Sequence, residues 1–148
     1  MSAYADTSFL VSLYTPDANS RRAAEQVGAI DGSIWLTPFG ELELSNALEL
    51  RLFRRELTAS AIKAAHSGFD EDLESGVFSR QPMPVGVFAR AGQLARRHTA
   101  RLGVRTLDVL HVASALMLSA TDFYTFDRNQ SKLARAQGLL VNREDPEE

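Results

Sequence analysis

The sequence predicts a single α/β domain, built as three α/β/α layers around a mainly parallel central sheet. Short apolar segments alternate with segments of helical periodicity along the whole chain, and strands that alternate with helices form parallel sheets with helices on both faces. The length of 148 residues suits one domain. Hydrophobic residues make up 45% of the chain and charged residues 24%, which is an ordinary globular composition and excludes wholesale disorder.

The amino-terminal half is expected to form two strands and four helices. A strand of small and apolar residues ends at Asp6, and the next residues can cap a helix that stops before Pro16. Pro38 suits the start of a long helix, and Thr58 can cap the helix that follows it. The expected strands cover residues 2–5 and 34–37, and the expected helices cover residues 7–14, 20–27, 38–56 and 59–76.

The carboxyl-terminal half is expected to form three strands and three helices. Gly103 should end one helix and Thr106 should cap the next, which places Asp108 in a first helical turn. The expected strands cover residues 78–85, 122–127 and 139–141, and the expected helices cover residues 87–101, 106–117 and 131–136. We therefore expect one domain over residues 1–142, with residues 143–148 as a frayed polar tail.

Several functional classes are disfavoured by composition. No apolar run approaches the roughly 18 residues that span a bilayer, and residues 1–11 lack the basic start and long apolar stretch of a secretion signal. The absence of cysteine removes disulfides, thiolate metal sites and cysteine nucleophiles. We therefore expect a cytoplasmic protein without membrane contact, whose metal ligands, if any, are oxygen atoms or imidazole groups.

Acidic and basic residues are unevenly distributed along the chain, although the net charge is only -3. Residues 75–107 contain no acid and six arginines. Such a run can bind the phosphates of RNA, or it can simply solvate one face of a helix. The candidates for RNA binding are Arg96, Arg97 and Arg101.

Acidic residues follow two of the predicted strands. Asp6 and Asp127 both lie at carboxyl ends, where ligands gather in parallel sheets. Asp108 begins a helix, so it could join them. Each acid also has a simpler explanation, because Asp6 can be a helix cap and Asp108 can stabilise the helix dipole.

Glu41 and Glu43 point to different sides of the same predicted helix, because residues two apart diverge by about half a turn. Glu43 shares its face with Asn46 and Ala47, a small and mostly apolar strip that suits a buried approach to a site. We therefore favour Glu43. Among the histidines, His111 lies one turn after Asp108, and a structural hydrogen bond is the favoured role for it over metal binding or base catalysis.

Four segments of the chain, in this order, resemble the PIN domain, and more narrowly the VapC-type toxins of bacterial toxin–antitoxin pairs. The resemblance covers nearly the whole chain, and the order of the segments is more specific than any single acid. The segments are Tyr4-Ala5-Asp6-Thr7-Ser8-Phe9-Leu10, Glu43-Leu44-Ser45-Asn46-Ala47-Leu48, Leu107-Asp108-Val109-Leu110-His111-Val112-Ala113 and Thr125-Phe126-Asp127.

The resemblance implies a metal-dependent endoribonuclease, inhibited by a cognate antitoxin and assembled as a homodimer. It also implies that four acids bind one or two Mg²⁺ or Mn²⁺ ions, with neighbouring polar side chains supporting them. The implied ligands are Asp6, Glu43, Asp108 and Asp127, and the implied supporting residues are Thr7, Ser8 and Thr125. Asn46 is a further supporting candidate, because it shares a helix face with Glu43. Magnesium prefers oxygen ligands, so its chemistry agrees with this set.

Two alternatives compete with this interpretation. A phosphorelay receiver also carries acids at strand ends but needs a lysine at the site, whereas Lys63 and Lys132 lie at no predicted strand end. A non-catalytic PIN-like domain that binds RNA or a protein partner would keep the fold and lose the chemistry. The presence of all four acids favours the enzyme over this second alternative.

Overall fold

The computed structural model of the chain describes residues 1–143 and contains one sheet of five parallel strands with seven helices. The strands are β1 (Ala3–Ala5), β2 (Ile34–Leu36), β3 (Phe78–Arg80), β4 (Asp122–Tyr124) and β5 (Leu140–Val141). The helices are α1 (Thr7–Tyr14), α2 (Ser20–Ala29), α3 (Pro38–Phe53), α4 (Ala59–Ser75), α5 (Val87–Leu102), α6 (Thr106–Met117) and α7 (Arg128–Ala136).

The strand order of the sheet is β3-β2-β1-β4-β5, so β1 lies at the centre. It pairs with β2 on one side and with β4 on the other, where Ala5 is opposite Tyr124. The chain adds β2 and β3 on one side of β1 and then returns to add β4 and β5 on the other side. In parallel sheets, ligands bind at the carboxyl ends of the two strands where this change of side occurs, here β1 and β4. This order differs from the 2-1-3-4-5 order of receiver domains, which excludes the phosphorelay alternative.

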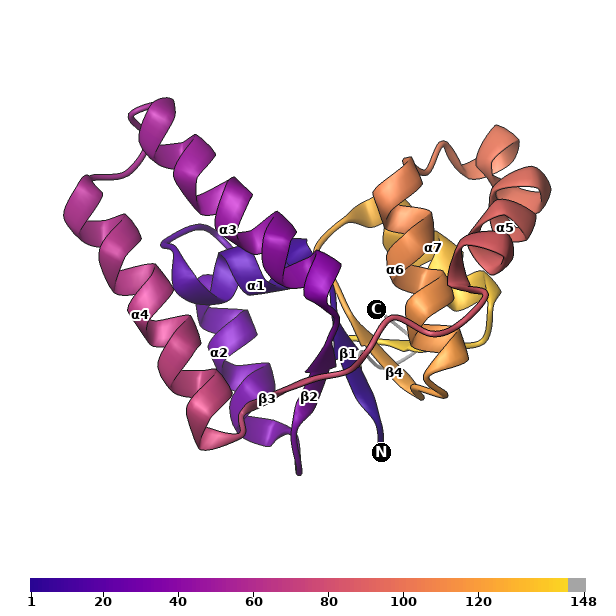
Figure 1. The fold of residues 1–148 in the computed structure, drawn as a ribbon, viewed down its shortest axis with the longest axis horizontal. Coiled ribbons are helices and arrows are strands. Elements are labelled where there is room, and N and C mark those ends of the chain that lie inside the picture. Colours follow the sequence, from indigo (N-terminus) through magenta and orange to yellow (C-terminus); the bar gives the residue numbers. More distant parts are fainter. Residues whose placement is uncertain (144–148) are drawn as a thin grey trace.

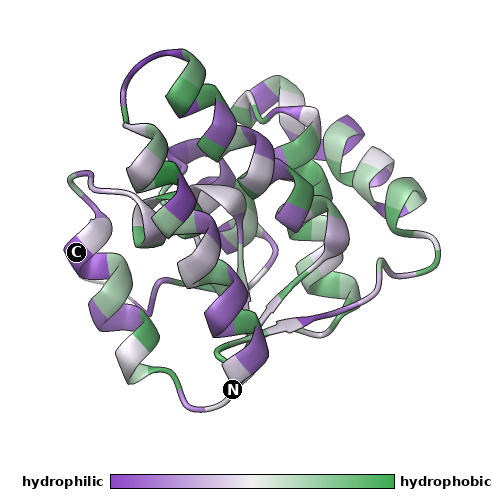
Figure 2. Ribbon diagram, turned by 60° about the vertical axis from the view of Figure 1, so that its left-hand side comes forward, coloured by the Kyte–Doolittle hydropathy of each residue, from purple (hydrophilic) through white to green (hydrophobic). Residues whose placement is uncertain are grey.

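Helices cover both faces of the sheet, as predicted, and give two hydrophobic cores. Ala3 and Ala5 face the core formed with α1, α2, α3 and α4, whereas Tyr4 faces the core formed with α5, α6 and α7. Figure 1 shows these two groups of helices on opposite sides of the central strands. In Figure 2, hydrophobic and hydrophilic residues alternate along the helices, as expected for amphipathic helices that cover a core. None of the helices within residues 1–143 is both long and apolar enough to cross a membrane.

Several element boundaries differ from the predictions. Strand β3 ends at Arg80 instead of reaching residue 85, because Pro82 and Pro84 have no N–H group for a strand ladder. Helix α3 ends at Phe53, and Arg55 then adopts a positive φ of 59°. Helix α7 begins three residues earlier than expected.

The cap of α6 is also different, because Arg105 occupies the cap position that the sequence assigned to Thr106. Thr106 is the first helical residue instead. Asp108 nevertheless lies in the first turn, as predicted, since the shift is only one residue.

Asn142, the last residue of the predicted domain, is anchored to the residue that follows β4. It is only 8% exposed, and its side chain accepts a 2.9 Å hydrogen bond from the Thr125 backbone N–H and donates a 2.7 Å bond to the Thr125 carbonyl. Arg143 also pairs with the buried Asp122. The contacts of the described chain thus extend to residue 143, the first residue of the predicted tail. Residues 144–148 lie outside the described part, so the frayed tail stays a prediction.

Asn142→Ala should destabilise the protein by about 2–4 kcal/mol, because it leaves both backbone groups of Thr125 without partners and places Ala at a φ of 53°. Asn142→Gly loses the same bonds without the backbone strain, so it should cost about 1 kcal/mol less. Urea denaturation of the three proteins measures both effects. Equal stability of the Ala and Gly variants would contradict the strain argument.

Candidate functional site

Asp6 connects the end of β1 to the start of α1. It is 1% exposed and caps α1 by accepting a 2.9 Å hydrogen bond from the Phe9 N–H. Ser8 Oγ donates to the same oxygen at 2.8 Å, and Thr125 Oγ1 donates to the other oxygen. The cap predicted as the simpler explanation is thus present, but the bond from Thr125 also ties Asp6 to the chain that follows β4.

Asp6 is held in an environment that disfavours its charge. Burial raises the pKa of the Asp6 carboxyl to about 6, although nearby His111 and the hydrogen bonds from Thr125, Phe9 and Ser8 favour the ionised form. The effect of burial on the pKa is larger than the effect of these favourable contacts, so the protein does not fully replace the hydration that the ionised carboxylate loses. Such a perturbed acid at a strand end is typical of functional sites.

Asp127 lies at the start of α7 and is linked to Asp6 through Thr125. Its carboxylate accepts a 2.8 Å hydrogen bond from the Gln130 N–H, and its own N–H donates to Thr125 Oγ1 at 2.9 Å. Ser8 strengthens this junction, because its hydroxyl accepts a 2.9 Å bond from the Phe126 N–H. The two strand ends at the centre of the sheet therefore share one hydrogen-bond network.

Asp108 lies in the first turn of α6, half-buried, and accepts a 3.3 Å hydrogen bond from the Arg105 N–H. Burial and the nearby charge of Asp127 raise the pKa of Asp108. The two carboxylates are thus close enough to repel each other, and a cation between them would relieve that repulsion.

Glu43 points from α3 toward α1 and α6. Its Oε1 accepts hydrogen bonds from Thr7 Oγ1 at 2.8 Å and from His111 Nε2 at 2.5 Å. Burial alone would raise the pKa of Glu43, but the bond and charge of His111, together with Thr7, hold it below its ordinary value. Glu41 instead pairs with Arg80 at 2.8 Å, so Glu41 and Glu43 point to different sides of α3, as predicted.

Asn46 does not join this network. Its side chain is exposed, and it makes no hydrogen bond within residues 1–143. The supporting role predicted for Asn46 therefore has no contact to carry it, whereas Thr7, Ser8 and Thr125 each bond to an acid.

His111 is the residue that sequence reasoning undervalued. It is 2% exposed, and its Nδ1 lies 2.8 Å from the Tyr4 hydroxyl while Nε2 contacts Glu43. The predicted structural hydrogen bond is thus present, together with a second bond to a candidate site residue. The spacing of three residues from Asp108 placed His111 on the same helix face, and this was the available signal.

The donor set fits a hard divalent ion such as Mg²⁺ or Mn²⁺. The acids supply carboxylate oxygens, and burial or mutual repulsion raises the pKa of two of them. Within residues 1–143, no three His, Asp or Glu side chains converge closely enough to form a metal cage by themselves. Because Mg²⁺ keeps several water ligands and often binds only one or two carboxylates, these residues still suit it.

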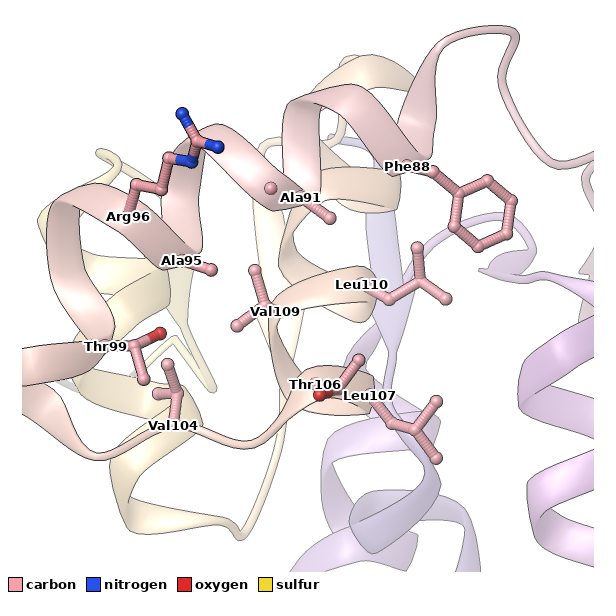
Figure 3. Close-up of a pocket in the computed structure, with 11 residues that line it drawn as sticks. Phe88, Ala91, Ala95, Arg96, Thr99, Val104, Thr106, Leu107, Val109 and Leu110 are labelled. Atoms are coloured by element: carbon pink, nitrogen blue, oxygen red, sulfur yellow. The ribbon is translucent and has the colours of Figure 1, made fainter.

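The arginines of α5 belong to another region. Arg96 lines an apolar pocket of about 600 Å³ between α5 and α6, together with Phe88, Val109 and Leu110. In Figure 3 the Arg96 side chain points away from these apolar residues. Arg97 and Arg101 are likewise exposed, and Arg101 contacts His98 at 3.3 Å. None of the candidate acids lines this pocket.

Comparison with protein families identifies the class of this chain. Residues 3–136 match the PIN domain model, so the chain belongs to the PIN domain family. Comparison with curated proteins gives no significant sequence match.

Several solved structures share the fold. The chain is similar to the Mycobacterium tuberculosis toxin VapC20, which cleaves the sarcin-ricin loop, with 21% identity, a TM-score of 0.71 and coverage of 94% of this chain and 97% of that one. It is similar to FitAcB of Neisseria gonorrhoeae, with 20% identity, a TM-score of 0.65 and coverage of 94% and 95%. A toxin-antitoxin complex of Klebsiella pneumoniae gives 17% identity, a TM-score of 0.61 and coverage of 97% and 100%.

The raised pKa of Asp6 predicts a pH-dependent stability in EDTA. An acid whose folded-state pKa exceeds its unfolded value stabilises the fold below the unfolded pKa, and this contribution is lost as pH rises through the folded pKa. A rise from 3.8 to about 6 corresponds to about 3 kcal/mol, lost between roughly pH 4 and pH 7.

Asp6→Asn should remove this dependence while keeping the cap. Denaturation of wild type and variant at several pH values measures it, with the exposed Asp31→Asn as a matched control. A stability difference between wild type and Asp6→Asn that stays constant with pH would contradict the burial argument.

Proposed function

We propose that this chain is a metal-dependent endoribonuclease and the toxin of a VapBC-type toxin–antitoxin pair. The observation that carries the proposal is the match to the PIN domain family over residues 3–136. The acids at the carboxyl edge of β1 and β4 support it, because this edge is the ligand-binding side of a parallel sheet.

Asp6, Asp108, Asp127 and Glu43 are the proposed holders of Mg²⁺ or Mn²⁺. The bound ion would orient and acidify a water for attack on phosphorus and stabilise charge on the leaving oxygen. Thr125 and Ser8 hold Asp6 in place by donating to opposite oxygens of its carboxylate.

Glu43 would act in a fixed position. His111 and Thr7 both donate to its Oε1, and no described residue donates to its Oε2. One oxygen of Glu43 is therefore committed to the protein, and the other remains available to the site. Tyr4 orients the imidazole of His111 from behind, through Nδ1.

An antitoxin chain and RNA are the proposed partners, and a homodimer is the proposed assembly. The similarity to a toxin that cleaves the sarcin-ricin loop and to a toxin-antitoxin complex supports the two partners. A non-catalytic PIN-like domain is the alternative, and the two experiments that follow separate it from the enzyme.

Purified protein should cleave single-stranded RNA with Mg²⁺ or Mn²⁺ and lose this activity in EDTA, because its proposed ligands are all oxygen atoms. Gel analysis of a labelled RNA measures cleavage, and Asp108→Asn serves as the control for contaminating nuclease. Undiminished cleavage in EDTA would contradict metal dependence, and no cleavage with either ion would favour the non-catalytic alternative.

Glu43→Gln should lower the cleavage rate by at least about 100-fold, since a lost metal ligand or catalytic charge typically costs several kcal/mol. Glu41→Gln is the matched control two residues away, and it should leave the rate nearly unchanged because Glu41 only pairs with Arg80 at the surface. Single-turnover rates compare the two variants. Equal losses would show that Glu43 has no special role.

A further inference from the structure

We propose that a hollow between α1 and α3 binds two phosphate groups of the RNA strand, a few nucleotides from the scissile phosphate, through Arg51 and Arg54. This inference rests on the proposed ribonuclease function and assigns part of its substrate path. The hollow has a volume of about 400 Å³, and both arginines line it. It lies on the helical layer of α1 and α3, which Figure 1 shows on the opposite side of the sheet from α5.

The hollow is continuous with the candidate site. Ser8 lines it, and the Ser8 hydroxyl donates to Asp6 at 2.8 Å. Phe126 also lines it, and the next residue is Asp127. An RNA strand whose scissile bond reaches Asp6 would therefore have neighbouring nucleotides at the entrance of this hollow.

Helix α3 connects the site to the arginines along one face. Glu43, Ala47, Arg51 and Arg54 are separated by four, four and three residues, so they follow one another on the same side of the helix. The rise of the helix places Arg51 about 12 Å and Arg54 about 16 Å beyond Glu43 along the axis. Helix α3 and its C-cap residue Arg54 thus hold two cations at set distances from the acid, within the span of a short oligonucleotide.

The charge of the hollow is positive. Among the described residues, Asp17 is the only acid that lines it, against two arginines. Its carboxylate accepts hydrogen bonds from Ser12 Oγ at 2.8 Å and from the Asn19 N–H at 2.7 Å, and it also interacts with the charge of Arg51. One positive charge therefore remains uncompensated in the hollow. Arg54 makes no ion pair within residues 1–143, so its guanidinium is available for a phosphate, which it can contact through two N–H groups.

The arginines of α5 differ in one respect, because no described residue that lines their pocket donates a hydrogen bond to a candidate acid through its side chain. Arg96 borders an apolar pocket that none of the acids lines, whereas the lining of the α1–α3 hollow includes Ser8, a direct partner of Asp6. The run of arginines in the sequence therefore marks a different surface from the one that adjoins the site. Two arginines of α5 can therefore serve as a control pair with the same charge as Arg51 and Arg54.

Salt-dependent RNA binding tests the proposal. The test pair is Arg51→Gln with Arg54→Gln, the control pair is Arg96→Gln with Arg97→Gln, and both are made in an Asp108→Asn background so that the RNA stays intact. The probe is a fluorescent single-stranded oligoribonucleotide, titrated with EDTA present over a series of salt concentrations. Each phosphate contact with a single strand contributes about 0.7 to the slope of log K against log salt.

We expect the test pair to reduce the slope by about 1.4, two contacts being lost, and the control pair to leave it unchanged. Replacing Arg51 and Arg54 by lysine should keep the slope, which separates lost charge from disturbed folding. An unchanged slope in the Arg51→Gln, Arg54→Gln variant would overturn the proposal. The RNA would then follow another surface such as α5, or the hollow would bind a protein partner. Absence of RNA binding by the Asp108→Asn parent would also contradict the ribonuclease function itself.

Discussion

The hydrogen bond between Thr125 and the buried Asp6 carboxylate is the contact on which the candidate site depends. It joins the residue after β1 to the residue after β4, the two strands between which the chain reverses its path across the sheet. Ser8 bonds to both residues, and Thr125 also accepts from the Asp127 N–H. Asp127 is therefore positioned by the same side chains that position Asp6.

The burial of the Asp6 carboxylate at this junction lowers the stability of the fold. A carboxylate that is 1% exposed has lost its hydration, and the surrounding donors recover only part of that energy, since its pKa remains raised. Asp108 and Asp127 add a second unfavourable interaction between like charges. Groups that oppose folding in this way are common where a protein needs them for binding or chemistry, because function and stability make different demands on the same residue.

The two helical layers meet above the edge of the sheet through His111. This residue extends from α6 to contact Glu43 of α3, while Tyr4 of the central strand supports its other nitrogen. Phe39, at the start of α3, packs against the imidazole with ring centres 4.3 Å apart. Contacts from both layers thus determine the position of Glu43. They also fix the orientation of the α3 face on which Glu43, Arg51 and Arg54 lie.

The sequence by itself determined the alternation of strands and helices, the caps at Asp6 and Thr58, and the acids at strand ends, because these features depend on residues close together in the chain. Helical spacing also placed Glu41 and Glu43 on different sides of one helix, while the choice of Glu43 as the site residue relied on the family resemblance as well. Only the tertiary structure decided the contact of His111 with Glu43, 68 residues away, and the anchoring of Asn142 to Thr125. It also decided which arginines adjoin the acids, since the layer in which a helix packs depends on contacts between segments that no local pattern encodes.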